Sequence, residues 1–523
     1  MKKTLLIALF ASGLLLSQTK DVSFGGSGTT FVNTPSTRDI AFNFFTNPDH
    51  SMVVLGSPGM GSGGMGFTTF RMIYKTAENG TMDTSFGTAG ASPTSIMVNQ
   101  DHILRLSDGK FITMGRHFGL NIQKFNADGT FDTAFGNNGT MEGIDMNNAS
   151  GYYIPNGVIE LANGQLIVAG AGTDTDNKLR TVLLRINTNG TLDTSFGING
   201  KKFIYLNTND TGSVAHNIFL SNNKLILTGA DGIAVTPPTR TFYVARLNLD
   251  GAFDTAFGNN GRIMKTFTND NTSYVDAARD DSGNIYIGGW CKATPASTTT
   301  STRIMKVTPE GALDSAFGDN GVANYSFLNI NGYKDEMIKS IAIGSNGIYV
   351  GGYMFETSFY YEQYASGFLS KFNLDGTPDL SFGNNGFYNF FGADQMMRRV
   401  AKIKFDDKKR LIVAGDSKLV DRQFTLTRFN IGNETLGIQG NSIITDEIKL
   451  YPNPANDFIR LKNLKSETEN IDFKITDLSG KLIKTGHYKQ SETIDVHDLE
   501  PGIYFIRMIL KNGKVHTEKI IKR

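Results

Sequence analysis

Short apolar runs separated by Gly, Asn and Asp recur from about residue 40 to about residue 430 of this chain. One series of runs ends in glycine, and a second run follows each member, as Val182 to Asn187 follows the third. The runs are rich in β-branched and aromatic residues, as strands are, and none keeps a helical apolar period over three turns. The pattern predicts successive β-strands. The runs that end in glycine are residues 53–56, 111–115, 166–170, 225–229, 285–289, 348–352 and 411–415.

A repeated phrase, Asp-x-x-Phe-Gly, follows the second run of each pair. A short relative opens the series at Asp21 to Gly25, and the other copies begin at Asp83, Asp132, Asp193, Asp254, Asp314 and Asp379. The steps between these aspartates are 62, 49, 61, 61, 60 and 65 residues. A nearly constant period of this size indicates an array of structural units, each burying its apolar face against its neighbours.

One unit can be assigned in full. Its predicted strands are residues 153–161, 165–170, 181–187 and 201–206. Tight turns at Ala162-Asn-Gly164 and Thr188-Asn-Gly190 join them, because Asn-Gly accepts the positive φ angles that such hairpins need. Four antiparallel strands per unit, repeated radially, are typical of a β-propeller blade.

The two ends of the repeat region complement each other. The last apolar pair ends at Asn430 with no Phe-Gly turn or fourth strand after it, whereas Asp21 to Asn33 supplies that piece alone. We therefore predict an all-β, seven-bladed β-propeller over residues 20–434, closed by its N-terminal strand, which would hide the sheet edges. A solenoid with capped ends is the alternative, and the split terminal unit argues against it.

Residues 1–19 have the pattern of a secretory signal peptide. Lys2 and Lys3 precede an apolar stretch from Leu5 to Leu16, which is too short for a stable membrane anchor. We expect cleavage near Ser17-Gln18 and a mature form without a transmembrane segment.

Composition narrows the choice of partners. The chain has 51 basic and 50 acidic side chains, a formal net charge of +1, and no basic stripe. This balance argues against nucleic acid as a partner. Cys291 is the only cysteine, so an intrachain disulfide is impossible, and stability must come from ring closure and packing.

The repeat ends before a predicted linker at residues 435–445, and residues 446–523 have a different pattern. In order and spacing, Ile448 to Arg523 resembles the type A C-terminal sorting domain of the Bacteroidetes type IX secretion system. The motifs that carry the resemblance are Leu450-Tyr-Pro-Asn-Pro-Ala455, Phe473-Lys-Ile-Thr-Asp-Leu-Ser-Gly-Lys481, Leu499-Glu-Pro-Gly-Ile-Tyr-Phe505 and the basic end Lys519 to Arg523.

This resemblance implies a small immunoglobulin-like β-sandwich that an outer-membrane translocon recognises and that surface processing machinery removes. The protein would pass through the periplasm, and its passenger would be released or attached to lipopolysaccharide at the cell surface. An ordinary binding module fused to the propeller is the alternative. The implied sorting-signal positions are Tyr451, Pro452, Asn453, Pro454, Gly480, Lys481, Pro501, Gly502 and Tyr504.

The repeats also resemble the delta-60 repeat of secreted bacterial β-propellers. Gly190 to Gly197, which reads Gly-Thr-Leu-Asp-Thr-Ser-Phe-Gly, carries the resemblance, and it extends from Asp21 to about Asn430. Pro378 and the turn Thr308 to Gly311 depart from the pattern. The resemblance supports the fold and implies no particular activity.

Few residues suggest chemistry. The segment Asn126 to Asp132 resembles part of a calcium loop, with copies at Asn187, Asn248 and Asn373. The same residues suit a hairpin in which Asp accepts backbone N–H bonds, and we favour that structural role. The seven histidines show no paired metal spacing, and Cys291 is best explained by packing. We therefore predict no catalytic residue, metal or cofactor.

The loop between the second and third strand of each unit varies most in length, and variable loops on a rigid scaffold often bind ligands. The sixth unit has the most aromatic of these loops, and such side chains stack on sugars or peptides. A loop that folds its aromatics onto its own blade is the alternative. The candidate ligand-binding residues are Tyr353, Phe355, Glu356, Phe359, Tyr360, Tyr361, Glu362 and Tyr364.

Two functions remain. We favour a non-catalytic secreted or cell-surface propeller that binds a glycan or a protein. The alternative is a secreted hydrolase or lyase acting on a polysaccharide, which would need paired acids with shifted pKa values. The acids on the variable loops form no recognisable pair in the sequence; they are Asp174, Asp176, Asp231, Glu356 and Glu362.

Overall fold

The computed structural model divides the chain into two units, residues 1–432 and 433–523. Every element assigned among the described residues is a β-strand, which confirms the all-β class. No helix in this part of the chain could span a membrane. The predicted signal peptide lies outside the described residues, apart from its last position, and so does the predicted linker. The structure describes residues 19–32, 40–57, 71–94, 99–116, 119–145, 154–206, 212–232, 240–267, 272–292, 300–327, 335–355, 365–392, 395–417, 424–431, 449–462, 470–477, 482–489, 492–509 and 515–523.

Unit 1 contains six sheets of four antiparallel strands, each built from consecutive strands. The first two contain β3 (Ile40–Thr46), β4 (Met52–Ser57), β5 (Met72–Thr76) and β6 (Ala91–Pro93), then β7 (Asn99–Arg105), β8 (Phe111–Arg116), β9 (Leu120–Phe125) and β10 (Thr140–Ile144). The third and fourth contain β11 (Ile154–Glu160), β12 (Leu166–Thr173), β13 (Leu179–Ile186) and β14 (Lys201–Ile204), then β15 (Ser213–Ser221), β16 (Lys224–Asp231), β17 (Arg240–Leu247) and β18 (Arg262–Phe267). The fifth and sixth contain β19 (Ser273–Arg279), β20 (Ile285–Lys292), β21 (Thr300–Val307) and β22 (Val322–Tyr325), then β23 (Asp335–Gly344), β24 (Gly347–Phe355), β25 (Ala365–Phe372) and β26 (Phe387–Asn389).

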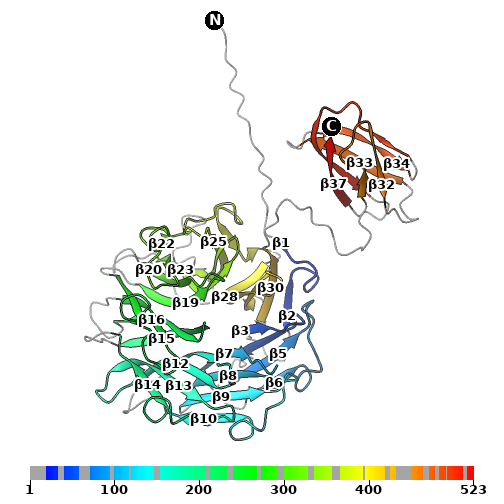
Figure 1. Ribbon diagram of the computed structural model, residues 1–523. Coiled ribbons are helices and arrows are strands. Elements are labelled where there is room, and N and C mark those ends of the chain that lie inside the picture. The colour runs from blue at the N-terminus through cyan, green and yellow to red at the C-terminus, as the bar shows by residue number, and fades with distance from the viewer. Residues whose placement is uncertain are drawn as a thin grey trace. The chain divides into compact units, whose positions relative to one another are not determined.

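A seventh sheet joins the two ends of the repeat region. It combines β27 (Phe391–Gly392), β28 (Gln395–Phe405), β29 (Leu411–Ser417) and β30 (Phe424–Asn430) with the N-terminal β1 (Thr19–Lys20) and β2 (Thr29–Val32). Both N-terminal strands pair antiparallel with β30, for example Lys20 with Phe429 and Thr29 with Thr427. Figure 1 shows the blue N-terminal strands beside β30.

The first long strand of each sheet contacts that of the next. These contacts run from β3 through β7, β11, β15, β19 and β23 to β28, and β28 contacts β3 in turn. The sheets of this unit therefore follow one another around a common centre (Figure 1). The surfaces that neighbouring sheets turn toward each other are apolar. For instance, one buried cluster contains Ile167, Leu183 and Phe196 of the third repeat with Leu227 and Tyr243 of the fourth.

The repeated aspartate pairs with a basic side chain eight residues earlier. Arg185 Nε donates to Asp193 Oδ2 at 2.7 Å, and Asp193 also accepts from the Ser195 backbone. Hydrogen bonds from Ser195 and Arg185 lower the pKa of Asp193 to about 2. The equivalent pairs are Lys75–Asp83, Lys124–Asp132, Arg246–Asp254, Lys306–Asp314 and Lys371–Asp379.

The seventh pair joins two segments from opposite ends of the unit's sequence. Arg428 lies on β30, and its Nε donates to Asp21 Oδ2 at 2.7 Å. The same guanidinium donates to the backbone oxygen of Glu78 at 2.5 Å and to Ser23 Oγ at 3.1 Å. Arg428 therefore connects the seventh sheet to the N-terminal segment and to the first repeat.

The repeated phenylalanine packs beneath the turn of the next repeat. A Cβ added to Gly129 would lie 2.7 Å from the Phe86 ring, and one added to Gly376 would lie 3.0 Å from Phe317. In the first of these turns Asp128 accepts hydrogen bonds from Thr130 N and Oγ1 at 2.9 and 2.7 Å. These bonds support the structural role that we favoured for this calcium-like segment.

Unit 2 consists of two sheets around one apolar core. The first contains β31 (Lys449–Tyr451), β32 (Phe458–Lys462) and β35 (Ile494–Asp495); the second contains β34 (Leu482–Lys489), β33 (Asn470–Asp477), β36 (Gly502–Ile509) and β37 (Val515–Lys522). Ile459 from the first sheet and Ile475, Ile506 and Ile520 from the second are fully buried in one cluster. The two sheets thus pack face to face.

We predict that Arg428→Ala lowers the free energy of unfolding of unit 1 by about 2–4 kcal/mol, because it removes at once the hydrogen bonds of a buried guanidinium to Asp21, Ser23 and the Glu78 backbone. Urea unfolding followed by tryptophan fluorescence would measure the change. Arg185→Ala is the matched control, since the hydrogen bonds of Arg185 to Asp193 and Ser195 lie within a single repeat. Equal losses in the two variants would contradict a special role for Arg428.

Candidate functional site

The first long strand of each sheet is its innermost strand, the one nearest the centre of unit 1. A β-bulge recurs at the same position of every innermost strand. In the third sheet Pro155 pairs with Gly170 and Gly157 with Ala169, so Asn156 is an extra residue. The partner before each bulge is the glycine that ends the second strand's apolar run. The extra residues in the seven sheets are Phe42, Asp101, Asn156, His216, Val275, Lys339 and Ala401.

The glycine is required because the bulge directs a carbonyl into the space of a Cβ. A Cβ at Gly170 would lie 1.9 Å from the Ile154 oxygen, and one at Gly352 would lie 2.1 Å from the Met337 oxygen. Bulges re-aim side chains near functional sites. Here the bulge and its glycine together determine which side chains of the innermost strand face the centre.

These side chains line a cavity of about 970 Å³ at the centre of unit 1. Its walls come from the innermost strands of all seven sheets, with Tyr353 of β24 and Asp416 of β29 added. The described bulge residues that line it are Phe42, Asn156, His216, Val275, Lys339 and Ala401. The sequence did not point to this group, since its members share no residue type; the glycine that ends each apolar run was the available signal.

Asp276 anchors a polar network in the cavity wall. Its Oδ2 accepts hydrogen bonds from Lys402 Nζ at 2.7 Å and Ser340 Oγ at 2.8 Å, and its Oδ1 accepts from Asn217 Nδ2 at 3.1 Å. Burial acts to raise the pKa of Asp276, but Lys402 and the hydrogen bonds outweigh it and hold the pKa below its usual value. Four sheets thus meet at one ionised carboxylate.

His216 belongs to the same region. Its ring stacks on Tyr274 with the ring centroids 4.5 Å apart and the planes inclined by 14°. The Tyr274 hydroxyl donates to Asn217 Oδ1 at 2.8 Å. Burial, with the nearby charge of Arg240, lowers the pKa of His216 to about 4, so the imidazole is neutral at pH 7.

Basic side chains complete the lining. Lys404 Nζ donates to the Phe44 oxygen at 2.5 Å, and burial lowers the pKa of Lys404 to about 7. Lys339 Nζ lies 5.4 Å from the Tyr353 ring centroid, within cation–π range. Arg399 donates two hydrogen bonds to the buried Asp416 carboxylate, at 3.0 and 3.3 Å.

The structure places only part of the predicted aromatic loop. Tyr353 lines the cavity, and Phe355 is the last residue of β24, although its side chain is not described. The other candidates, Glu356, Phe359, Tyr360, Tyr361, Glu362 and Tyr364, lie outside the described residues. The predicted ligand site and the cavity therefore meet at Tyr353.

Two of the acids on the variable loops come together. Arg180 Nη2 donates to Asp176 Oδ2 at 2.6 Å, and its Nε lies 3.6 Å from Asp174 Oδ2. Asp174 also accepts a hydrogen bond from the Tyr205 hydroxyl. Asp231 accepts one from the backbone N–H of Gly232 at 2.8 Å. Arg180 thus pairs with both neighbouring carboxylates.

In unit 2, Asn453 of the Pro-Asn-Pro motif is hydrogen-bonded to the last strand. Asn453 Nδ2 donates to the Lys519 oxygen at 2.6 Å, and its Oδ1 accepts from Ile521 N at 2.8 Å. Tyr504 donates to the Glu500 oxygen at 2.8 Å. Tyr451, Pro452, Pro454 and Pro501 are exposed and Gly502 is half-buried, whereas Gly480 and Lys481 lie outside the described residues.

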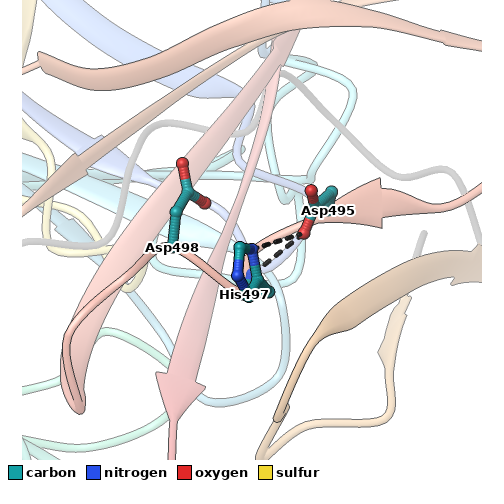
Figure 2. A group of neighbouring side chains, drawn as sticks. All are labelled: Asp495, His497 and Asp498. Atoms are coloured by element: carbon teal, nitrogen blue, oxygen red, sulfur yellow. Dashed lines mark hydrogen bonds and ion pairs between the residues drawn. The ribbon is translucent and has the colours of Figure 1, made fainter.

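Unit 2 also brings together Asp495, His497 and Asp498 (Figure 2). All three side chains are exposed. Asp498 Oδ1 accepts from Lys484 Nζ at 2.8 Å, and Asp495 Oδ1 accepts from the His497 backbone at 3.0 Å. The group is therefore an ion-paired surface turn.

Two family models match parts of this chain. Residues 449–523 match the secretion system C-terminal sorting domain. Residues 161–196 and 220–257 match a family described as a domain of unknown function (DUF5122) beta-propeller. The sorting-domain and propeller resemblances are thus confirmed. No curated protein matches this chain.

Solved structures are similar only at low identity. They include the extracellular domain of a hybrid two-component system from B. thetaiotaomicron, at 11% identity over 97% of this chain and 58% of that one, with a TM-score of 0.37. A protein of unknown function from Bacteroides caccae is 11% identical over 68% and 99%, with a TM-score of 0.33. An alpha-L-arabinofuranosidase from Clostridium thermocellum is 10% identical over 54% and 93%, with a TM-score of 0.28. This chain spans 58% of the first of these proteins, and none of the three similarities bears on function.

We predict that Gly352→Ala destabilises unit 1 by about 3 kcal/mol or more, because the new Cβ collides with the Met337 carbonyl and the bulge beside Lys339 cannot form. Gly109→Ala is the control. Gly109 has a positive φ, 83°, which Gly352 does not have, but nothing lies within 4 Å of a Cβ added at Gly109, so only about 1–2 kcal/mol of backbone strain is expected. Thermal and urea unfolding would measure both, and similar losses would contradict the steric argument.

Proposed function

We propose that this exported protein, a β-propeller family member with a secretion system C-terminal sorting domain, is a non-catalytic binding protein of the cell exterior. The sorting domain directs export by type IX secretion to the cell surface or extracellular space. The ligand, a glycan or a protein, would occupy the central cavity of unit 1.

The cavity is the observation that carries this proposal. A volume of about 970 Å³ is at the upper end of the roughly 300–1,000 Å³ of ligand pockets. Hydrogen-bonding and aromatic side chains from every sheet converge there, and bulges backed by glycines hold the strands that carry them. A site held by packed strands loses little conformational freedom on binding, which favours affinity.

We also propose a seven-bladed propeller of delta-60 repeats over residues 20–434, closed by its N-terminal strand. The pair between Arg428 and Asp21 supports closure, as does the contact between β28 and β3. Residues 1–19 would be a signal peptide and residues 435–445 a linker. Residues 446–523 would form an immunoglobulin-like sandwich, read by the translocon and surface processing machinery; the shared core of its two sheets supports this.

Charge pairing in the cavity favours binding over hydrolysis. A hydrolase of the predicted kind needs a carboxylic acid with a raised pKa beside a second carboxylate. Asp276 is paired with Lys402 and has a lowered pKa, and Asp416 is held by Arg399. Turnover of a polysaccharide by the purified protein would instead support the hydrolase or lyase.

The aromatic segment after Tyr353 would extend the site. Tyr353 lies at the cavity wall, and Phe355 to Tyr364 follow it in the sequence. Their aromatic side chains and the acids Glu356 and Glu362 would contact the part of the ligand that projects from the cavity.

We predict that Tyr353→Ala weakens binding of a ligand found on a glycan array about tenfold, the loss expected for one aromatic contact. The Tyr360→Ala/Tyr361→Ala pair should weaken it less, because those residues would touch only the projecting part. Calorimetry would measure both against Tyr205→Ala, an exposed tyrosine that follows β14. Unchanged affinity in Tyr353→Ala would remove the cavity from consideration.

We predict that Asn453→Ala destabilises unit 2 by about 1–2 kcal/mol, because it removes two hydrogen bonds to the backbone of β37, and that it lowers export several-fold. Immunoblots of medium, surface and periplasmic fractions would measure export. His497→Ala, which removes an exposed side chain of the same unit, is the control. Normal export of Asn453→Ala despite lower stability would contradict a role for this motif in sorting.

A further inference from the structure

The cavity concentrates positive charge in a chain that is nearly neutral overall. Among the described residues, five basic side chains and two acidic ones line it, an excess of three, whereas the whole chain carries +1. The basic residues are Arg279, Lys339, Arg399, Lys402 and Lys404, and the acidic ones are Asp276 and Asp416.

Both acids are already neutralised. Asp276 pairs with Lys402 at 2.7 Å, and Asp416 pairs with Arg399 at 3.0 Å. No ion pair among the described residues involves the three remaining cations, Arg279, Lys339 and Lys404. Within the described part of the chain, Arg279 and Lys404 donate to neutral backbone oxygens, such as those of Leu220 and Phe44, and Lys339 lies over the Tyr353 ring.

These three cations lie on different sheets and at two levels of the cavity. Lys339 is the bulge residue of β23, whereas Lys404 and Arg279 come three and four residues after the bulges of β28 and β19. At about 3.3 Å per residue, the second level lies roughly 10–13 Å further along the strands. Charges separated in this way suit a chain-like anion better than a single phosphate.

The neighbouring groups suit a saccharide. Asn43, Asn156 and the neutral His216 offer hydrogen bonds to hydroxyl groups, and Phe42 and Tyr353 offer aromatic faces. Such a mixture binds polar rings in a largely preformed pocket. An anion beside Lys404 would also favour its charged form, since a neighbouring opposite charge raises the pKa of an amine.

We propose that the cavity binds an acidic oligosaccharide whose carboxylates meet Lys339 at one level and Lys404 and Arg279 at the other. The proposal rests on the proposed binding function and specifies its ligand class. Each carboxylate would form a charge-assisted hydrogen bond with an ammonium or guanidinium group that has no other anionic partner among the described residues.

The test uses the purified mature protein with defined probes: oligogalacturonate, neutral chitooligosaccharide, a chondroitin sulfate oligosaccharide and a phosphorylated peptide. We expect oligogalacturonate to bind, and added salt to weaken the binding. Lys339→Glu should weaken it about tenfold or more. Lys178→Glu is the matched control, because Lys178 is 57% exposed on a loop outside the cavity lining, and its affinity should be unchanged.

Each other result would overturn the proposal in an identifiable way. Binding of the neutral sugar alone, weakened by Tyr353→Ala, would leave the binding function standing and remove the acidic ligand. Preference for the sulfated sugar would show that the cavity recognises sulfate groups and not carboxylates. Preference for the phosphopeptide would show that the ligand is not a saccharide. Binding of none of the probes would overturn the acidic oligosaccharide, while the binding function would still be tested by the glycan array. Lys339→Gln provides a milder variant should Lys339→Glu fail to fold, with the expected loss several-fold.

Discussion

The close approach of a strand-one carbonyl to a strand-two glycine is the constraint on which the rest of unit 1 depends. At Gly170, Gly229 and Gly415 an added Cβ would lie 1.9–2.0 Å from the carbonyl of the facing strand. The carbonyl can occupy that space only because glycine has no side chain, and the innermost strand then gains one residue. One extra residue changes which face of the strand the following side chains occupy. The bulge thus lets an apolar repeat present polar groups such as Asn156 and His216 to the centre.

A second set of interactions holds the repeats together and is independent of the cavity. The repeated aspartate pairs within its own repeat, and the repeated phenylalanine packs under the turn of the next repeat, as Phe86 does at Gly129. The pair between Arg428 and Asp21 applies the same rule to segments that lie 407 residues apart. Because these contacts recur almost unchanged, they account for the regularity of the sequence, and the inner strands are left to vary.

This division explains what the sequence could predict. The strands, the repeat and the sorting domain follow from local patterns: the predicted strand at residues 165–170 appears as β12 and that at 201–206 as β14. The polar network could not be predicted in this way. Lys402 meets Asp276 across 126 residues of sequence, and neither belongs to a motif. The recurrent glycine could be seen in the sequence, but its role in forming the bulge could be recognised only from the register of the facing strand. The aromatic segment was chosen for its composition, and only Tyr353 can be related to the cavity.

The residues at the bulge argue for where recognition resides. The seven repeats agree in their glycine, aspartate and phenylalanine, yet their bulge positions hold Phe42, Asp101, Asn156, His216, Val275, Lys339 and Ala401, all different. A position with a purely structural role would be expected to repeat along with the rest of the unit. The register shift is the same at each of these positions, so the differences act through the side chains, and those that are described line the cavity. An asymmetric set of groups on a nearly symmetric frame suits a ligand with its own direction, such as a chain whose two ends differ.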